Sequence, residues 1–203
     1  MTARGRTPAM KVGALRLYLE NHLQNELVWC LRAATEWHVQ HELQRRIDGN
    51  HIQVYAMDST FLHARTLFEF FTKNAQVAKN PDGNYYTCDI FGVAPLSSSL
   101  YTGDWQDILH RYIMHAQNRS RPRKLKSYDN QATTKDLKDM PVDFAREVVR
   151  LWREFCQCLH SQPDRVSQQL ATKADGILQF AITTTKPVLD KEGPHANITP
   201  ITW

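Results

Sequence analysis

The sequence predicts an all-α fold, in the form of a single helical bundle of about five helices. Glycine and proline together make up only 17 of the 203 residues, which is little for a turn-rich β-sandwich or barrel. Apolar residues recur at three- and four-residue intervals over most of the chain, as they do on one face of a helix. Hydrophobic residues are 42% and charged residues 23% of the chain, which is ordinary globular usage.

The first helical region covers residues 11–47, which contain no proline and one early glycine. Its apolar side chains follow helical spacing from Leu15 to Leu43, so we expect one long helix or two joined by a kink. Asp48-Gly49-Asn50 then provides the stop signal.

A second helix is expected from Asp58 or Ser59 to about Lys73, with Asp58 as its N-cap. At about 100° per residue, the side chains that gather on one side of this segment are Phe61, Ala64, Leu67, Phe68 and Phe71. His63 falls inside this apolar arc as its only polar residue. A buried histidine needs a hydrogen-bond partner, because an unpaired one costs about 1–3 kcal/mol.

Residues 74–103 are predicted to form an irregular connection, since Asn80-Pro-Asp-Gly83 indicates a turn. Within it, residues 85–91 fit either a short strand or an extended crossing segment. A third helix is expected from Asp104 to about Asn118, with Leu109 on its core face.

Two more helices complete the expected bundle. Pro141 suits the first turn of one that runs to Leu159, and the last restarts after Pro163. The organisation we expect is a basic N-terminal tail over 1–10, a helical-bundle domain over 11–182 and an extended or mobile C-terminal tail over 183–203.

Several function classes lack their motifs in this chain. Neither GxGxxG nor GxxxxGK[ST] occurs, and GxSxG is also missing, so dinucleotide binding, Walker-type hydrolysis and acyl-transfer hydrolysis have no support. The four cysteines show no CxxC spacing, and the histidines lack ligand partners at standard intervals. We therefore expect no cofactor and no metal. No apolar run approaches the ~18 residues of a membrane span, so we expect a cytoplasmic protein with reduced thiols and no membrane association.

The strongest chemical candidates are Arg111 and His115, four residues apart on the third predicted helix and so on one face. A guanidinium can neutralise phosphate oxygens, while an imidazole exchanges protons near neutral pH. The alternative is an ordinary surface ion pair between Asp107 and Arg111, with His115 at the edge of the core. His63 is either a satisfied core residue or shares one groove with Arg111 and His115.

A basic segment follows this helix directly, with five cations in the eight residues Arg119–Lys126. Of these, Arg119, Arg121, Arg123 and Lys124 are the candidates for contact with a nucleic-acid backbone. No base-reading motif accompanies them, and a solvated basic loop is the alternative.

Two motifs carry a family resemblance: Phe61-Leu-His-Ala-Arg-Thr-Leu-Phe-Glu-Phe-Phe71 and Ile108-Leu-His-Arg-Tyr-Ile-Met-His115. They resemble small bacterial helical proteins that are similar to the HEPN superfamily, over roughly residues 55–160. The resemblance implies a dimeric helical bundle and, in many members, a metal-independent endoribonuclease of toxin–antitoxin, CRISPR or phage-defence systems. It also implies that Arg111 holds the scissile phosphate and that His115 is the acid/base for attack by the RNA's own 2′-hydroxyl. Three residues, Tyr112 to Met114, separate the pair here, fewer than is usual in that family, which also has inactive binding members.

The leading expectation is therefore a HEPN-like cytoplasmic homodimer that cleaves or binds RNA in a defence or toxin–antitoxin-type system. Arg111 and His115 would form its site, with His63 in support. Two alternatives stay open. One is a non-enzymatic helical module, an adaptor or antitoxin-like protein, whose aromatic faces bury against a protein partner. The other is a small-ligand sensor with a pocket around His63 and the phenylalanines.

Overall fold

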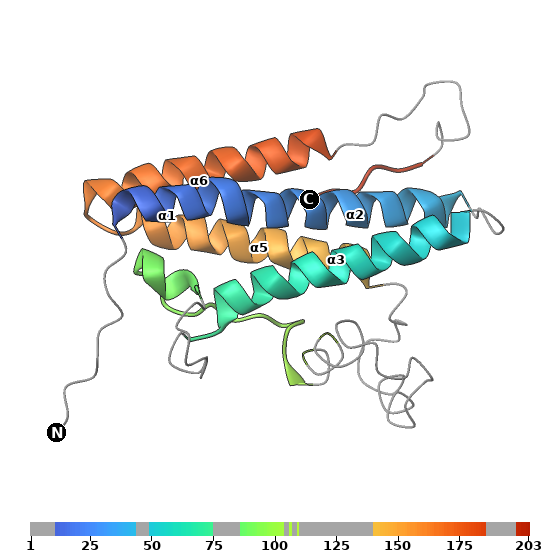
Figure 1. Cartoon of the computed structure of the whole chain (residues 1–203), viewed down its shortest axis with the longest axis horizontal. Coiled ribbons are helices and arrows are strands. Elements are labelled where there is room, and N and C mark those ends of the chain that lie inside the picture. The colour runs from blue at the N-terminus through green and yellow to red at the C-terminus, as the bar shows by residue number, and fades with distance from the viewer. Residues whose placement is uncertain are drawn as a thin grey trace.

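The protein is an all-α helical bundle, as predicted. The computed structural model describes residues 11–43, 49–74, 86–103, 106, 109, 140–185 and 198–203. Helices α2 and α3 form an antiparallel pair, and α5 and α6 form a second one joined by a short turn (Figure 1). Both pairs pack against each other, with α5 in contact with α2, α3 and α6. The helices are α1 Val12–Tyr18, π-helical η1 Leu19–Leu23, α2 Gln24–Glu42, α3 Gly49–Thr72, α5 Pro141–His160 and α6 Arg165–Thr184.

The described residues form four long helices, of which α1, η1 and α2 together make one continuous helix, and these correspond to four of the about five that the sequence predicted. The helix predicted over 104–118 lies outside the described residues except for 106 and 109. Leu109 is fully buried in the hydrophobic core, as expected. No helix in the described part of the chain is both long and apolar enough to cross a membrane.

The first helix is continuous, which is the first of the two expected alternatives, and it contains a single π-helical turn. Leucines recur every fourth residue at Leu15, Leu19, Leu23 and Leu27, and all four are buried. In a regular α-helix, with 3.6 residues per turn, such a stripe would rotate by about 40° at every step. The wider turn at Leu19–Leu23, in which the Gln24 amide donates to the Leu19 carbonyl, corrects this drift and keeps the leucines on one face.

The predicted start of the second helix at Asp58 is wrong. α3 begins at Gly49, so Asp58 lies inside the helix. An N-cap contributes only about 1 kcal/mol, which packing along α2 outweighs. The Gln53 amide, for example, is 3.4 Å from Nδ1 of His41 on α2, and Ala56 is buried.

Of the irregular connection, residues 86–103 are described, and they contain no strand. A 3-10 helix, η2 Cys88–Phe91, replaces the predicted strand or extended segment, and it ends at Gly92 in the left-handed conformation with φ 74°. The Leu96 amide donates to the Phe71 carbonyl at 2.8 Å, which fixes the following segment on the end of α3. The predicted irregularity is thus confirmed for these residues.

The buried carboxylate of Glu147 on α5 holds the same segment in place. Its Oε1 accepts from the Ser98 hydroxyl at 2.8 Å and from the Ser99 amide at 3.1 Å. Arg150, one turn along α5, donates from Nε to Oε2 at 2.8 Å and from Nη2 to the Ser97 carbonyl at 2.6 Å. An irregular segment is therefore ordered by hydrogen bonds where it has no regular structure of its own.

The last two helices agree with the prediction. Pro141 occupies the first turn of α5, and Asp164 caps α6 by accepting from the Ser167 amide at 2.9 Å. The predicted apolar seam of α5 is entirely buried, and its members are Phe144, Val148, Leu151, Trp152, Phe155 and Leu159.

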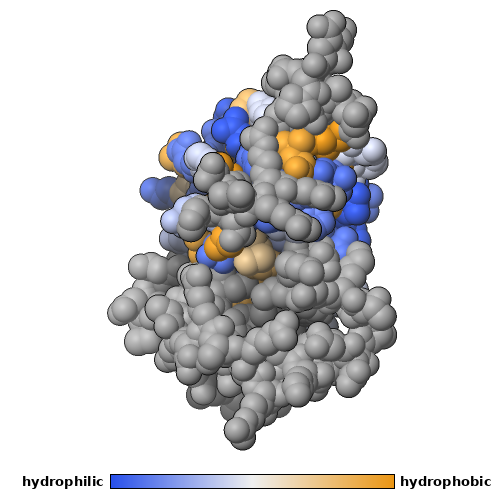
Figure 2. Space-filling view, turned by 90° about the vertical axis from the view of Figure 1, so that its right-hand side faces the viewer, coloured by the Kyte–Doolittle hydropathy of each residue, from blue (hydrophilic) through white to orange (hydrophobic). Residues whose placement is uncertain are grey.

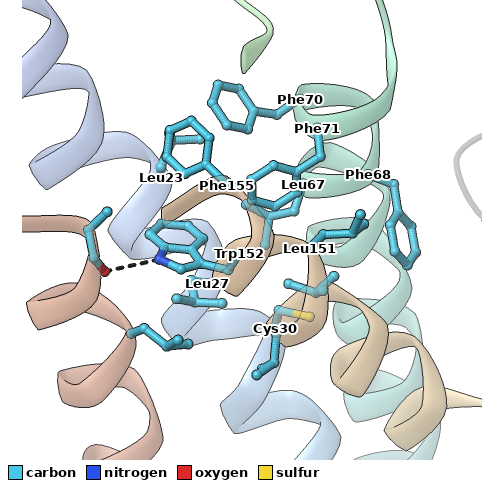
Figure 3. Packing of buried hydrophobic residues seen from close by; sticks show 14 of the residues in the cluster. Leu23, Leu27, Cys30, Leu67, Phe68, Phe70, Phe71, Leu151, Trp152 and Phe155 are labelled. Atoms are coloured by element: carbon cyan, nitrogen blue, oxygen red, sulfur yellow. Dashed lines mark hydrogen bonds between the residues drawn. The ribbon is translucent and has the colours of Figure 1, made fainter. Parts of the chain in front are cut away.

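Aromatic rings of α3 and α5 fill the centre of the bundle (Figure 3). Phe71 meets Trp152 and Phe155 at ring-centroid distances of 6.0 and 5.7 Å, in tilted or edge-on geometry. The indole nitrogen of Trp152 donates to the Ala174 carbonyl of α6 at 3.0 Å, so the only polar atom of that side chain is satisfied. This contact also ties α6 to α5.

Residues 198–203, at the end of the predicted C-terminal tail, are extended but packed on the bundle. Ile198 is buried, and the Thr199 carbonyl lies 2.9 Å from Nε2 of His38 on α2. Arg153 of α5 donates to the Trp203 carbonyl at 3.1 Å. The bundle therefore includes residues beyond the boundary expected at 182.

Candidate functional site

His63 lies on α3 at its contact with α2, where it pairs with a carboxylate. Its Nδ1 is 2.8 Å from Oε2 of Glu26, and the two side chains are 20% and 19% exposed. The predicted need for a partner is thus confirmed. A carboxylate can only accept, so Nδ1 carries the proton, and in the neutral ring the lone pair is on Nε2. No residue in the described part of the chain bonds to Nε2.

Aromatic rings adjoin this pair. Tyr18, the last residue of α1, stacks on His22 with ring centroids 5.0 Å apart, and Tyr86 meets Tyr18 edge-on at 5.0 Å. Burial, the charge of Glu26 and the nearby Tyr86 raise the pKa of Tyr18, so its phenol stays protonated at neutral pH. We call Tyr18, His22, Glu26, His63 and Tyr86 the Tyr18–His63 cluster.

The cluster combines a proton-accepting atom with flat rings at a partly exposed surface. An imidazole held by a carboxylate can act as a general acid or base, and aromatic rings can stack on unpaired bases. No lysine or arginine of the described residues pairs with its members. A phosphate at this site would need a cation from elsewhere in the chain or from a second copy.

The other predicted site residues lie outside the described residues. These are Arg111, His115, Arg119, Arg121, Arg123 and Lys124. That His63 shares a groove with Arg111 and His115 therefore stays a prediction.

Glu69 is a second buried carboxylate, but its contacts are those of a structural residue. It accepts from Nε of Arg65 at 3.1 Å, from Nζ of Lys73 at 2.9 Å and from the Tyr101 hydroxyl at 3.3 Å. Through these contacts the carboxylate joins α3 to the segment of 86–103 that contains Tyr101.

The described environments of the cysteines favour the protonated thiol. All four are free thiols. Burial raises the pKa of Cys88 to about 12 and also raises the pKa of Cys30 and Cys156, so these thiols stay protonated at neutral pH. Among the residues that the structure describes, no three histidine, cysteine or acidic side chains come together as a metal site would require.

Sequence reasoning identified His63 but not its partner Glu26, which is 37 residues earlier. A signal was present, because Glu26 also falls within a stripe of apolar residues, one turn from buried Leu23 and Cys30. Two polar residues inside two apolar stripes are candidates for a pair, but the register between the helices decides whether they meet. A cavity formed by described residues lies elsewhere, between α2, α3 and the end of α6, and His63 does not line it.

Comparison with protein-family models, with curated proteins and with solved structures found no match to this chain.

Proposed function

We propose that this protein is a HEPN-like helical protein that acts on RNA as a metal-independent endoribonuclease or an RNA-binding protein. We place it in the cytosol, as part of a defence or toxin–antitoxin-type system. The observation that carries the proposal is the His63–Glu26 pair at 2.8 Å, next to the stacked rings of Tyr18 and His22. The four free thiols agree with a reducing compartment.

In this proposal, Glu26 orients His63 so that Nε2 can take the proton of a ribose 2′-hydroxyl. The 2′-oxygen then attacks the neighbouring phosphorus, and the bond from phosphorus to the 5′-oxygen breaks. The departing oxygen takes a proton from a second acid, for which His115 is the candidate, and Arg111 neutralises the phosphate. The products are a 2′,3′-cyclic phosphate and a 5′-hydroxyl, so atoms and protons balance.

The test measures cleavage of single-stranded RNA by the purified protein in EDTA. We expect His63→Gln, Arg111→Ala and His115→Ala each to lower the rate by about 10²-fold or more. Glu26→Gln should lower it less, because the amide can still hold the ring while the carboxylate charge is lost.

The matched control is His160→Gln. His160 also pairs with a carboxylate, Asp175, at 2.7 Å, but on the exposed surface of α5 and α6. Its loss should leave cleavage unchanged. If the wild type neither cuts nor binds RNA, and all variants are equally harmless on expression, the proposal is wrong.

The proposal includes a homodimer, because a second copy is one source of the cation that the described cluster lacks. Sedimentation equilibrium should give twice the 23.5 kDa of the chain. Mixing Arg111→Ala with His63→Gln protein should restore part of the activity if the two protomers complete one site. A monomer that retains full cleavage activity would contradict this part.

The second candidate function is a non-enzymatic module that binds another protein. Its support is the exposure of large apolar side chains on separate helices, with Leu17 58% and Phe180 49% exposed. The case is weaker, since single exposed apolar residues are common on soluble proteins. A salt series separates the two functions: RNA binding through phosphates weakens steeply with salt, and an apolar protein interface does not.

A further inference from the structure

A groove opens between α2 and α3, which run side by side (Figure 1). It has a volume of about 590 Å³ and is lined by residues of 29–40, 52–59 and 184–185. We call it the α2–α3 groove. Three large apolar side chains on its walls face solvent: Trp29 of α2 is 52% exposed, and Ile52 and Tyr55 of α3 are 47% and 71% exposed. Figure 2 looks at the end of the bundle where α2 ends and α3 begins, and it shows hydrophobic side chains at the surface beside hydrophilic ones. A group of exposed apolar residues around one groove is typical of a surface that binds a partner.

Along this groove α2 exposes a single row of side chains. Between positions 27 and 40 the exposed residues of the helix are Trp29, Arg32 and Glu36, and all the others are buried or half-buried. The three are spaced by three and four residues, so they lie on one side of the helix. We call them the α2 row. It presents one aromatic ring, one cation and one anion to whatever covers the groove.

The two charges of the α2 row do not pair with each other. The Arg32 guanidinium lies 5.9 Å from the centre of the Trp29 ring, and a Glu36 oxygen accepts from the Gln40 amide at 2.7 Å. An arginine four residues before a glutamate is also the less favourable order for an ion pair within a helix. Both charges are therefore available to a partner.

From this arrangement we infer that the α2–α3 groove is a contact surface for a second copy of this chain, with the two α2 helices antiparallel about a two-fold axis. In a two-fold contact both copies present the same surface, so that surface must be complementary to itself. An axis that crosses α2 midway between positions 32 and 36 brings Arg32 of each copy opposite Glu36 of the other. Parallel α2 helices would instead set like charges opposite each other, which is unfavourable.

The same axis brings Trp29 to the groove of the second copy. Trp29 lies five residues from position 34, where the axis crosses, so it comes level with position 39 of the other α2. Val39 and Ile52 both line the groove, and Ile52 is next to Gln53, whose amide is 3.4 Å from His41. Each Trp29 ring thus meets an open, partly apolar end of the other groove. Tryptophans buried in this way carry a large share of the binding energy of interfaces.

This surface would serve the homodimer of the proposed function, and it does not depend on the RNA chemistry. Glu26 comes one turn before Trp29 on α2, and His63 comes one turn after Ser59 on α3. The second copy would therefore lie beside the Tyr18–His63 cluster. A contact made by two helices of each copy belongs to the smaller interfaces, so we expect dissociation in the micromolar range.

The test is sedimentation equilibrium of the full chain across the micromolar range, where we expect the wild type to dimerise. Arg32→Glu and Glu36→Arg each bring two pairs of like charges together, and each should weaken the dimer by at least about tenfold. An equimolar mixture of these two variants should associate as the wild type does, because every contact in the mixed dimer is again between opposite charges. The double variant Arg32→Glu/Glu36→Arg should recover the dimer for the same reason.

An apolar variant and two controls complete the set. Trp29→Ala should weaken the dimer by at least about tenfold, because it removes the ring that enters the other groove. Leu17→Ala is its matched control, since Leu17 is a large, exposed apolar residue of α1 that does not line the groove. Arg16→Glu makes the same change of charge as Arg32→Glu, also away from the groove. Both controls should leave association unchanged, and thermal melts confirm that each variant is folded.

Three results would overturn the inference. If the wild type is a monomer across the micromolar range, the homodimer of the proposed function is wrong as well, and the groove belongs to another partner. If Arg32→Glu, Glu36→Arg and Trp29→Ala, all folded, dimerise as the wild type does, the interface lies elsewhere and only this inference is wrong. The third is a mixture of the two charge variants that stays monomeric where the wild type dimerises. A dimer that responds as expected but neither cuts nor binds RNA would support the inference and contradict the RNA function.

Discussion

The two halves of α3 pack in opposite ways. From Phe61 to Phe71, phenylalanines contact the aromatic rings of α5. The indole nitrogen of Trp152, in the same core, is hydrogen-bonded to a backbone carbonyl. From Ile52 to Ser59, the same helix faces α2 across a groove of about 590 Å³, and two buried oxygens of α2 residues that line this groove lack hydrogen-bond partners. Close packing of aromatic rings contributes several kcal/mol to the free energy of unfolding. An unfilled groove with unpaired polar atoms beside it lowers that free energy instead. The comparison indicates that the half of α3 from Phe61 to Phe71 contributes more to the stability of the bundle than the half from Ile52 to Ser59.

The largest expected effect is the removal of a core ring. Phe71→Ala should lower the free energy of unfolding by about 3–5 kcal/mol, because it leaves a cavity beside Trp152 and Phe155. Tyr55→Ala on the groove side of the same helix should change it by less than about 0.5 kcal/mol. Urea unfolding followed by circular dichroism measures both. Equal losses would show that the two halves do not differ.

The next largest effect is expected from a matched pair of substitutions that replace a small side chain by a large one. Ala64, on α3, is fully buried in the core cluster, whereas Ala56, eight residues earlier, lines the groove. Ala64→Leu should cost about 1–3 kcal/mol through overpacking, and Ala56→Leu should be neutral or slightly stabilising because its extra atoms enter empty space. The comparison fails if Ala56→Leu is the more destabilising of the two.

Buried polar groups give a smaller effect and a pH dependence. Burial alone would raise the pKa of Glu147, but hydrogen bonds from Arg150 and Ser98 outweigh it and hold this pKa below its ordinary value. Because this pKa is lower in the folded state, Glu147 adds stability at pH values above the ordinary pKa of about 4.5. That stability is lost as the pH falls from about 4.5 towards the folded-state pKa. Glu147→Gln should cost about 1–2 kcal/mol at pH 7 and should reduce the loss of stability in acid.

Glu154→Gln is the control for Glu147. Glu154 binds the same Arg150 at 2.8 Å, but its side chain is 40% exposed, so its loss should change the unfolding midpoint little. Urea midpoints at pH 7, 5, 4 and 3 give the comparison. An acid response of Glu147→Gln equal to that of the wild type would contradict the assignment.

The smallest effect expected is a gain in stability. Thr35→Val removes the unpaired groove hydroxyl without changing the shape of the side chain, and it should raise stability by up to about 1 kcal/mol. Thr60→Val provides the contrast, because its hydroxyl is buried but bonded to the Ala56 carbonyl at 2.8 Å, and its loss should be neutral or destabilising. Melting temperatures suffice to rank the two. A stabilising Thr60→Val with a destabilising Thr35→Val would reverse the interpretation of the groove.

The parts of the fold that could be predicted from the sequence are those that depend only on the local pattern of apolar residues. The seam of α5 from Phe144 to Leu159 was predicted residue by residue, because a strong apolar period is a local property. The start of α3 was not, since Asp58 is a good cap and only the packing of α2 carries the helix back to Gly49. The 3-10 turn at Cys88–Phe91 was missed because short apolar segments do not distinguish between extended and turn conformations.

For the candidate site, the sequence predicted one residue, His63, but not the residues that surround it. His63 was identified by its place among phenylalanines, and Glu26 pairs with it only because α2 and α3 meet in one particular register. The groove was not predicted for the same reason. Ala33 and Ala56 are each unremarkable helix residues, and they make a cavity only when α2 and α3 bring them to the same place.

The π-helical turn at Leu19–Leu23 makes the turn geometry of the first helix a determinant of the candidate site. A π turn accommodates one extra residue in an α-helix, so deleting one residue there would let the helix close into regular α geometry with both flanking segments facing as they do now. If the same residues formed a regular α-helix without the deletion, everything before the turn would rotate by about 100° about the helix axis relative to α2. Tyr18 would then leave its place beside Glu26 and Phe70, although no residue of the cluster had been replaced. In this stretch the single wide turn therefore decides which side chains of the first helix face the cluster.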